Sequence, residues 1–252
     1  MRVFLTLLFK ELRSFFYSPV AYVVLALVMI INGFSFRAAI VVLETSPQQG
    51  SIVTWTFNSQ WFWLSYFFLF PLLTMRLFAE ERKMGTFETL FTAPVHTWQV
   101  VWAKYLASVF IYCLLWVPSF LNFIIFQSMT GGAAEIPAGA LSGTYILLFF
   151  MGLFNLAIGC FASSLSANQI VAAVITFTIS LMHFLIGIFA LFLGRRLPAQ
   201  FVDLVSYIAT VDHIRVFTNG LLDSRPLVYY FSISLLFLIL THYVLEFRRW
   251  RF

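Results

Sequence analysis

Six long apolar segments constrain the fold of this chain more than any other feature of the sequence. They run approximately over residues 19–42, 60–78, 105–126, 144–162, 169–193 and 227–245. A helix needs about 20 mostly apolar residues to cross the hydrocarbon of a bilayer. The segments are continuously apolar and lack the two-residue alternation of a membrane β-barrel. The sequence therefore predicts an all-α integral membrane protein with six transmembrane helices, in a single transmembrane domain over residues 1–252.

The composition excludes several classes of protein. Only 10% of the 252 residues are charged and 62% are hydrophobic, whereas soluble domains carry about 25% charged residues. A soluble globular enzyme, a disordered chain and a nucleic-acid-binding domain are therefore excluded. Cys113 and Cys160 both lie inside apolar runs, so we expect neither a disulfide framework nor a metal site.

The positions of the basic residues predict the orientation of the chain. With the N-terminus inside, the inner segments hold Arg2, Lys10, Arg13, Arg76, Arg82, Lys83, Lys104, Arg248, Arg249 and Arg251. The outer segments hold fewer: Arg37, Arg195, Arg196, Arg215 and Arg225. The acidic residues divide evenly, so the whole net charge of +5 lies on one side. The positive-inside rule then places both termini in the cytoplasm, facing anionic lipid rather than nucleic acid.

Residues 1–18 have the pattern of an amphipathic helix. Apolar residues recur at three- and four-residue spacing: Leu5, Leu8, Leu12, Phe15 and Phe16. The opposite side carries Arg2, Lys10 and Arg13. We expect an interfacial helix that these basic residues anchor to the inner membrane surface. A frayed cytosolic tail is the alternative.

Residues 79–104 form the only sizeable loop on the predicted cytoplasmic side. Phe87, Leu90 and Phe91 fall on one helical face, and Pro94 ends that short helix. An apolar face held below the bilayer needs a surface to cover it. That surface is either the protein's own bundle or a cytosolic partner.

The external loop over residues 194–226 alternates apolar and charged residues, which predicts two short helices. Asp212 beside His213 raises the alternative of a catalytic or metal pair. The chain has only four histidines and no second ligand cluster, so ion pairing that shapes a cap is favoured.

Most chemistry-bearing motifs are missing from the sequence. It has no phosphate loop, no His-Glu-x-x-His and no Gly-x-Ser-x-Gly, so we expect no enzyme activity and no cofactor in this chain. No acidic residue lies in the middle of a span, which argues against ion-coupled transport. His183 is the strongest polar candidate within a span, and the alternative is that it only bonds neighbouring helices.

One region carries a family resemblance. Residues 74–94 read TMRLFAEERKMGTFETLFTAP, and residues 98–105 read WQVVWAKY. This region, with the order of interfacial helix and six spans, resembles the ABC-2 type permease subunits of ATP-driven exporters. More narrowly, residues 10–22 and 212–250 are similar to the GldF-like gliding-motility permeases.

The resemblance implies an ABC-2 (type V exporter-like) architecture in a bacterial cytoplasmic (inner) membrane. Two permease subunits, identical or related, would pair and dock onto cytosolic ATPase subunits that hold ATP and magnesium. An auxiliary extracytoplasmic subunit is a further partner that the resemblance allows. The coupling region would comprise Glu80, Glu81, Gly85, Thr86, Phe87, Glu88, Thr89, Leu90, Phe91 and Pro94.

The sequence does not identify a substrate, but aromatic residues in the second span indicate a candidate path for one. Trp63, Phe67 and Phe70, with His183, are candidates to line an apolar pathway, and the alternative is that the rings face lipid or pack in the bundle. Two other functions stay open. One is a non-transporting membrane scaffold or assembly component of a motility or secretion complex. The other is an intramembrane enzyme that uses His183 or His213.

Overall fold

The computed structural model describes residues 2–45, 50–87, 95–131, 136–193, 200 and 205–249. Every element in this part of the chain is a helix, which confirms the all-α prediction there. The helices are α1 (Arg2–Tyr17), α2 (Pro19–Thr45), α3 (Ile52–Asn58), α4 (Gln60–Thr74), α5 (Ala79–Lys83), α7 (Thr97–Met129), α8 (Ala138–Leu165), α9 (Gln169–Leu193), α11 (Thr210–Thr218) and α12 (Ser224–Arg249).

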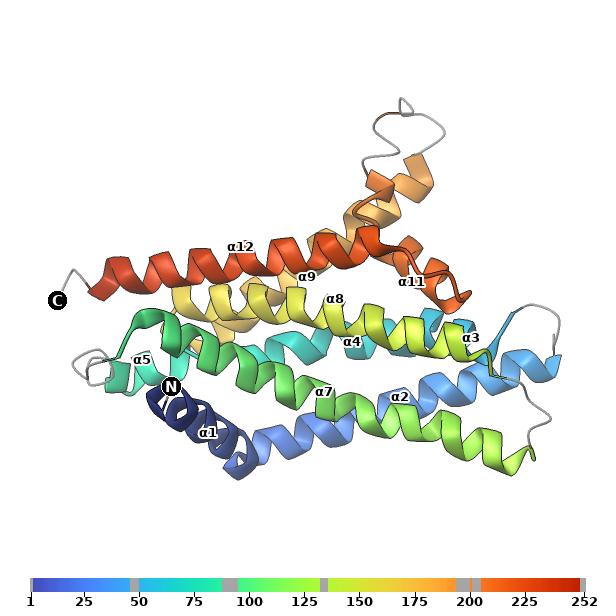
Figure 1. Ribbon diagram of the computed structural model, residues 1–252, viewed down its shortest axis with the longest axis horizontal. Helices are drawn as coiled ribbons and strands as arrows, with labels where there is room; N and C mark the ends of the chain where they lie inside the picture. Colours follow the sequence, from blue (N-terminus) through green and yellow to red (C-terminus); the bar gives the residue numbers. More distant parts are fainter. Residues whose placement is uncertain are drawn as a thin grey trace.

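Five helices in the described part are long and apolar enough to cross a membrane. They are α2, α7, α8, α12 and the Gln169–Phe189 part of α9. The predicted span over residues 60–78 contains α4, which has 15 residues and is shorter than the roughly 20 that a perpendicular span needs. The sixth span therefore stays a prediction. The start of α1 and the end of α12 lie at one end of the bundle, beside α5 (Figure 1); we call this the α5 end.

Serine side chains fix the boundary between α3 and α4, where the second predicted apolar segment begins. Ser59 lies between the two helices, and its hydroxyl accepts a hydrogen bond from Phe62 N at 3.1 Å, which caps α4. From α2, the buried Ser35 donates to Thr56 O at 2.5 Å and lies 2.6 Å from the Ser59 hydroxyl. These bonds satisfy backbone groups that a helix end leaves open.

The centre of the bundle is α8, which packs between α12, α9, α7 and α4. In its most apolar stretch 72% of the residues are buried, against 22–39% in the other spanning helices. Glycines allow this close packing. A Cβ on Gly152 would lie 2.1 Å from Tyr112 Cε1 of α7, and one on Gly159 would lie 2.1 Å from Thr74 Oγ1 of α4.

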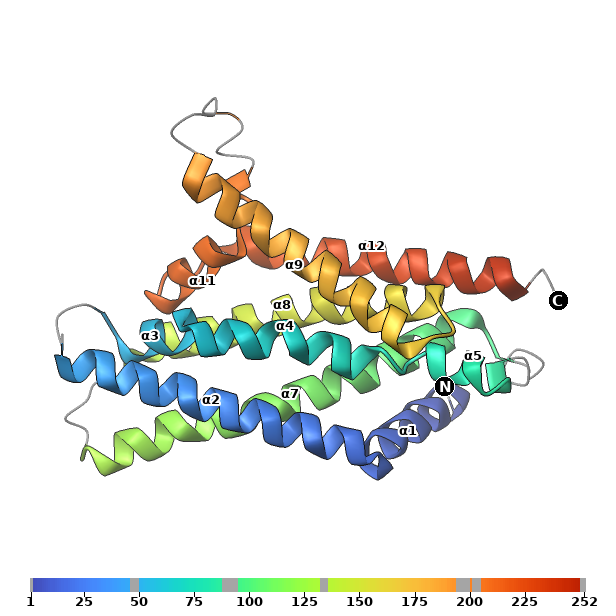
Figure 2. The same ribbon diagram turned by 180° about the vertical axis from the view of Figure 1, so that it is seen from behind.

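The N-terminal helix α1 packs on α7 at the α5 end and is inclined to α2 (Figure 2), so the frayed-tail alternative is wrong. Of the predicted apolar face, Leu12 and Phe15 pack against the bundle, whereas Leu5 and Phe16 are exposed. The buried face instead includes Glu11, which is 9% exposed. The apolar periodicity misassigned this face because the carboxylate is neutralised by a cation from another helix.

Candidate functional site

The turn between α4 and α5 is fixed to the end of α8. The backbone N–H groups of Phe78 and Ala79 donate to Ser163 Oγ at 3.0 and 3.1 Å. Arg82 Nη1 donates to the carbonyl oxygen of Ser164 at 3.2 Å. The first N–H groups of a helix have no partner within it, so the Ser163 hydroxyl supplies what the start of α5 lacks. The loop therefore starts from a fixed attachment on the central helix.

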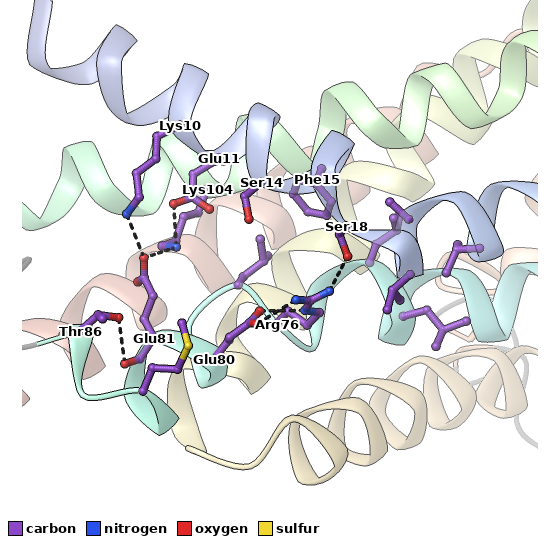
Figure 3. Close-up of a pocket in the computed structure, with 17 residues that line it drawn as sticks. Lys10, Glu11, Ser14, Phe15, Ser18, Arg76, Glu80, Glu81, Thr86 and Lys104 are labelled. Carbon is purple, nitrogen blue, oxygen red and sulfur yellow. Dashed lines mark hydrogen bonds and ion pairs between the residues drawn. The ribbon is translucent and has the colours of Figure 1, made fainter.

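A buried ion cluster connects α5 to two further helices (Figure 3). Lys104 Nζ of α7 lies 2.9 Å from Glu11 Oε1 of α1 and 3.0 Å from Glu81 Oε1 of α5. The Lys104 side chain is only 3% exposed, and its ammonium lies 5.5 Å from the centre of the Phe78 ring. Buried charges are retained when they are paired. One lysine thus holds α1, α5 and α7 together.

A second ion pair joins α5 to the junction of α1 and α2. Arg76 binds both carboxylate oxygens of Glu80, at 2.7 and 2.8 Å, in the two-pronged geometry that suits a guanidinium. The same guanidinium donates to Ser18 Oγ at 2.5 Å. The hydrogen bonds from Arg76 lower the pKa of Glu80 despite its partial burial, so this carboxylate is ionised at neutral pH.

The predicted coupling residues therefore have different environments. Glu80 and Glu81 lie in ion pairs, and Thr86 donates to the carbonyl oxygen of Glu81 at 3.3 Å. Gly85 has a φ of +70°, a conformation that glycine adopts without steric cost. Phe87 is 6% exposed and belongs to the protein's own core. For this ring, the structure shows the own-bundle alternative.

The rest of the predicted coupling region lies outside the described residues: Glu88, Thr89, Leu90, Phe91 and Pro94. Within the described part of this loop, the apolar side chain of Met84 is 63% exposed. The sequence reasoning passed over Met84, although it is the sole apolar residue between Ala79 and Gly85.

The structure describes the side chains of two of the three predicted membrane anchors, Lys10 and Arg13. The Lys10 side chain is 61% exposed and its ammonium lies 3.6 Å from Glu81 Oε1, so it also reaches α5. Arg13 is exposed. Arg2 begins α1, but its side chain lies outside the described part. The residues that sequence reasoning missed are Glu11 and Lys104. The sequence could have indicated Lys104, because it is the only charged residue between positions 97 and 134.

The candidate pathway residues lie elsewhere in the bundle. The rings of Trp63 and Phe67 pack against Phe184 of α9, with centroids 4.6 and 4.9 Å apart, and both are partly exposed. Phe70 is fully buried. His183 lies 3.0 Å from the Tyr229 hydroxyl and 3.3 Å from Thr210 Oγ1, so it bonds neighbouring elements, as its alternative supposed. The pathway stays a prediction.

In the loop that was predicted to be external, one of the two expected short helices is observed as α11, and residues 201–204 lie outside the described part. His213 of α11 is 6% exposed, and its Nδ1 lies 2.9 Å from the Tyr230 hydroxyl. The His213 ring therefore faces the bundle. Ion pairing between the charged residues of this loop stays a prediction. Burial lowers the pKa of His213 to about 4.

This shift predicts a loss of stability in mild acid. An unfolded histidine has a pKa near 6.5, so between about pH 6.5 and 4 the unfolded chain binds more protons at His213 than the folded chain. The free energy of unfolding should fall by up to about 1.4 kcal/mol for each pH unit in this window. His213→Gln should remove this share, which melting temperatures of both proteins at pH 7, 6 and 5 will test. Equal acid sensitivity of both would contradict the prediction.

Comparison with known proteins agrees with this architecture. The sequence model described as ABC-2 family transporter protein matches residues 16–183, which is more than half of the chain. No curated protein matches the chain at a significant level. The matched region includes the end of α1, the loop around α5 and all of α8. The chain belongs to the ABC-2 transporter family, as a multi-pass membrane component that is not itself catalytic.

Proposed function

We propose that this chain is the permease subunit of an ATP-binding cassette exporter, and that a separate cytosolic ATPase subunit hydrolyses ATP to drive the transport. The supporting observation is the attachment of α5. At the start of the predicted coupling loop, Glu81 binds Lys104 of α7, which also binds Glu11 of α1. The backbone N–H groups of Phe78 and Ala79 donate to Ser163 of α8. A force applied to this loop would therefore reach three helices at once.

The buried contacts make the loop suited to transmit movement. Lys104, Glu11 and Glu81 are held by short ion pairs, and packed elements move as rigid bodies between discrete states. The ATPase would contact the exposed tip, where Lys83, Met84 and Thr86 are accessible, together with the predicted coupling residues up to Pro94. Closure of the ATPases would then tilt the permease between inward- and outward-facing states.

Further parts of the proposal concern assembly and location. We propose a pair of permease subunits in the bacterial inner membrane, with the α5 end in the cytoplasm. Large apolar side chains are exposed along α2 and α9, including Val23, Ile30, Val174 and Phe189; lipid or the second subunit would cover them. Placement in the GldF-like group is supported by the sequence patterns over residues 10–22 and 212–250. The substrate is unidentified.

Co-purification tests the proposed coupling. The tagged protein is extracted from its native membranes in mild detergent, and its partners are identified by mass spectrometry. We expect a phosphate-loop ATPase with the wild type, and at least a tenfold lower recovery with the double variant Glu88→Arg, Leu90→Asp at unchanged expression. The matched control is Glu44→Arg, Met129→Asp. Both of its side chains are exposed and lie at the opposite end of the bundle, so it should retain the ATPase.

Two outcomes would contradict the proposal. If no ATPase accompanies the wild type while the bundle stays folded, the transporter would lack an energy source and the scaffold alternative would be favoured. If the loop variant and the control lose the ATPase equally, the docking surface lies elsewhere.

A further inference from the structure

A cavity of about 320 Å³ lies at the α5 end, bounded by α1, the start of α2, the end of α4 and α5 (Figure 3). We propose that it binds one phospholipid with a primary amine in its headgroup, of the phosphatidylethanolamine type. The ammonium would bind Glu81, and the phosphate would lie toward Lys10. Lipid binding at this cavity would not depend on transport.

The charges around the cavity favour a headgroup without net charge. Its lining holds three basic and three acidic side chains: Lys10, Arg76, Lys104, Glu11, Glu80 and Glu81. An anion would meet the three carboxylates, and a cation would meet the three basic groups. A zwitterion can place its positive group beside one carboxylate and its negative group beside one lysine, so it matches both sets.

One carboxylate oxygen indicates where the ammonium binds. Lys10 and Lys104 both approach Glu81 Oε1, at 3.6 and 3.0 Å. Glu81 Oε2 is buried and has no hydrogen-bond partner within the described chain. A buried charged oxygen without a donor is costly. A primary ammonium supplies three N–H donors, whereas a quaternary ammonium such as choline supplies none.

Lys10 is the group best placed to meet the phosphate. Its side chain is 61% exposed, and its contact with Glu81 is the longest ion pair of the site. The other two cations are already engaged, since Arg76 binds both oxygens of Glu80 and the buried Lys104 binds two carboxylates.

The apolar part of the cavity lies where acyl chains would run. Val20, Ala21 and Val24 come from the first turns of α2, and Leu72 and Leu73 from the last turns of α4. These turns are at the ends of apolar helices, so this wall is at the depth of the hydrocarbon, while α1 and α5 are at headgroup level. A cavity with one charged and one apolar wall at this depth fits an amphiphile.

A second cavity provides space for the rest of the molecule. It has a volume of about 460 Å³ and shares Ser14, Ser18, Val20, Arg76 and Glu80 with the first cavity. It extends to Gln169 at the start of α9. The space therefore continues from the first cavity, past Arg76 and Ser18, to the start of α9.

Native mass spectrometry tests the proposal on the full chain. Delipidated protein in detergent is mixed with equal amounts of phosphatidylethanolamine, phosphatidylcholine and phosphatidylglycerol that carry distinguishable acyl chains. We expect one phosphatidylethanolamine per chain, retained at least about tenfold more than phosphatidylcholine, because only the former donates a charge-assisted hydrogen bond to Glu81. In Glu81→Gln this preference should fall to near one.

A pair of uncharged substitutions tests the site without changing its charges. Ala21→Phe should fill the apolar wall and reduce retention of phosphatidylethanolamine about tenfold. Val23→Phe is the matched control, because Val23 is two residues away, 65% exposed and outside the cavity lining; it should bind lipid like the wild type. This pair remains informative if Glu81→Gln does not fold.

Three results would overturn the inference. Equal retention of phosphatidylethanolamine and phosphatidylcholine by the wild type would show that Glu81 receives no ammonium. A preference for phosphatidylglycerol would show an anion site. Unchanged retention in Ala21→Phe would show that the lipid binds elsewhere on the protein.

Discussion

Replacing Lys104 with methionine is expected to destabilise the protein by about 3–5 kcal/mol. The substitution keeps the length and most of the volume of the side chain but removes the ammonium. Glu11 and Glu81, which lie 2.9 and 3.0 Å from it, would then face each other as partly buried carboxylates without a shared cation. Removing one partner of a buried ion pair costs more than the pair itself contributes, because the remaining charge stays desolvated.

Lys10→Met is the matched control for this prediction. Lys10 approaches the same oxygen of Glu81, but its side chain is 61% exposed and the contact is 3.6 Å long. Exposed pairs of this kind contribute about 0–1 kcal/mol. The same chemical change should therefore have a much smaller effect at position 10 than at position 104.

A triple variant separates the effect of unpaired charge from that of lost packing. Adding Glu11→Gln and Glu81→Gln to Lys104→Met removes every charge of the buried cluster, so most of the lost stability should return. Unfolding in mixed micelles with increasing sodium dodecyl sulfate, followed by circular dichroism, measures all of these variants. A Lys104→Met protein as stable as Lys10→Met would show that water reaches the cluster and that it does not hold the helices together.

The sequence predicted the long helices well because a membrane span is encoded locally. About 20 consecutive apolar residues suffice to indicate each one, and α2, α7, α8, α9 and α12 all appear at the expected places. The short helix α3, which precedes the second predicted segment, was not predicted in this way. Ser35 contacts Thr56 and Ser59 at its junction with α4 from another helix.

The candidate site shows the same division between local and distant information. Glu80 and Glu81 were selected from a contiguous stretch of sequence. Glu11 was missed because its partner Lys104 is 93 residues away in the chain. The periodicity of residues within α1 does not depend on that contact and could not indicate it. Phe87 was predicted on an apolar face and its ring is buried, but a pattern within one segment does not show which surface covers such a ring.

Gly152→Ala is expected to destabilise the bundle by about 2–4 kcal/mol, from overpacking and a lost hydrogen bond. The added Cβ would lie 2.1 Å from Cε1 and 2.4 Å from Cζ of Tyr112. The Tyr112 ring is 1% exposed, and its hydroxyl donates to Leu148 O at 2.7 Å. Because the ring is enclosed and also hydrogen-bonded, it can move only if α7 separates from α8.

Two comparisons establish that the contact with Tyr112 is the cause. Gly33→Ala introduces the same methyl group into α2, where nothing lies within 4 Å of the new Cβ, and it should change stability by no more than about 1 kcal/mol. In a Tyr112→Ala background, the clash at Gly152 disappears, so Gly152→Ala should cost little or nothing there. If the two substitutions instead destabilise the protein additively in the same micelle assay, α7 and α8 are not in the close contact that makes α8 the centre of the bundle.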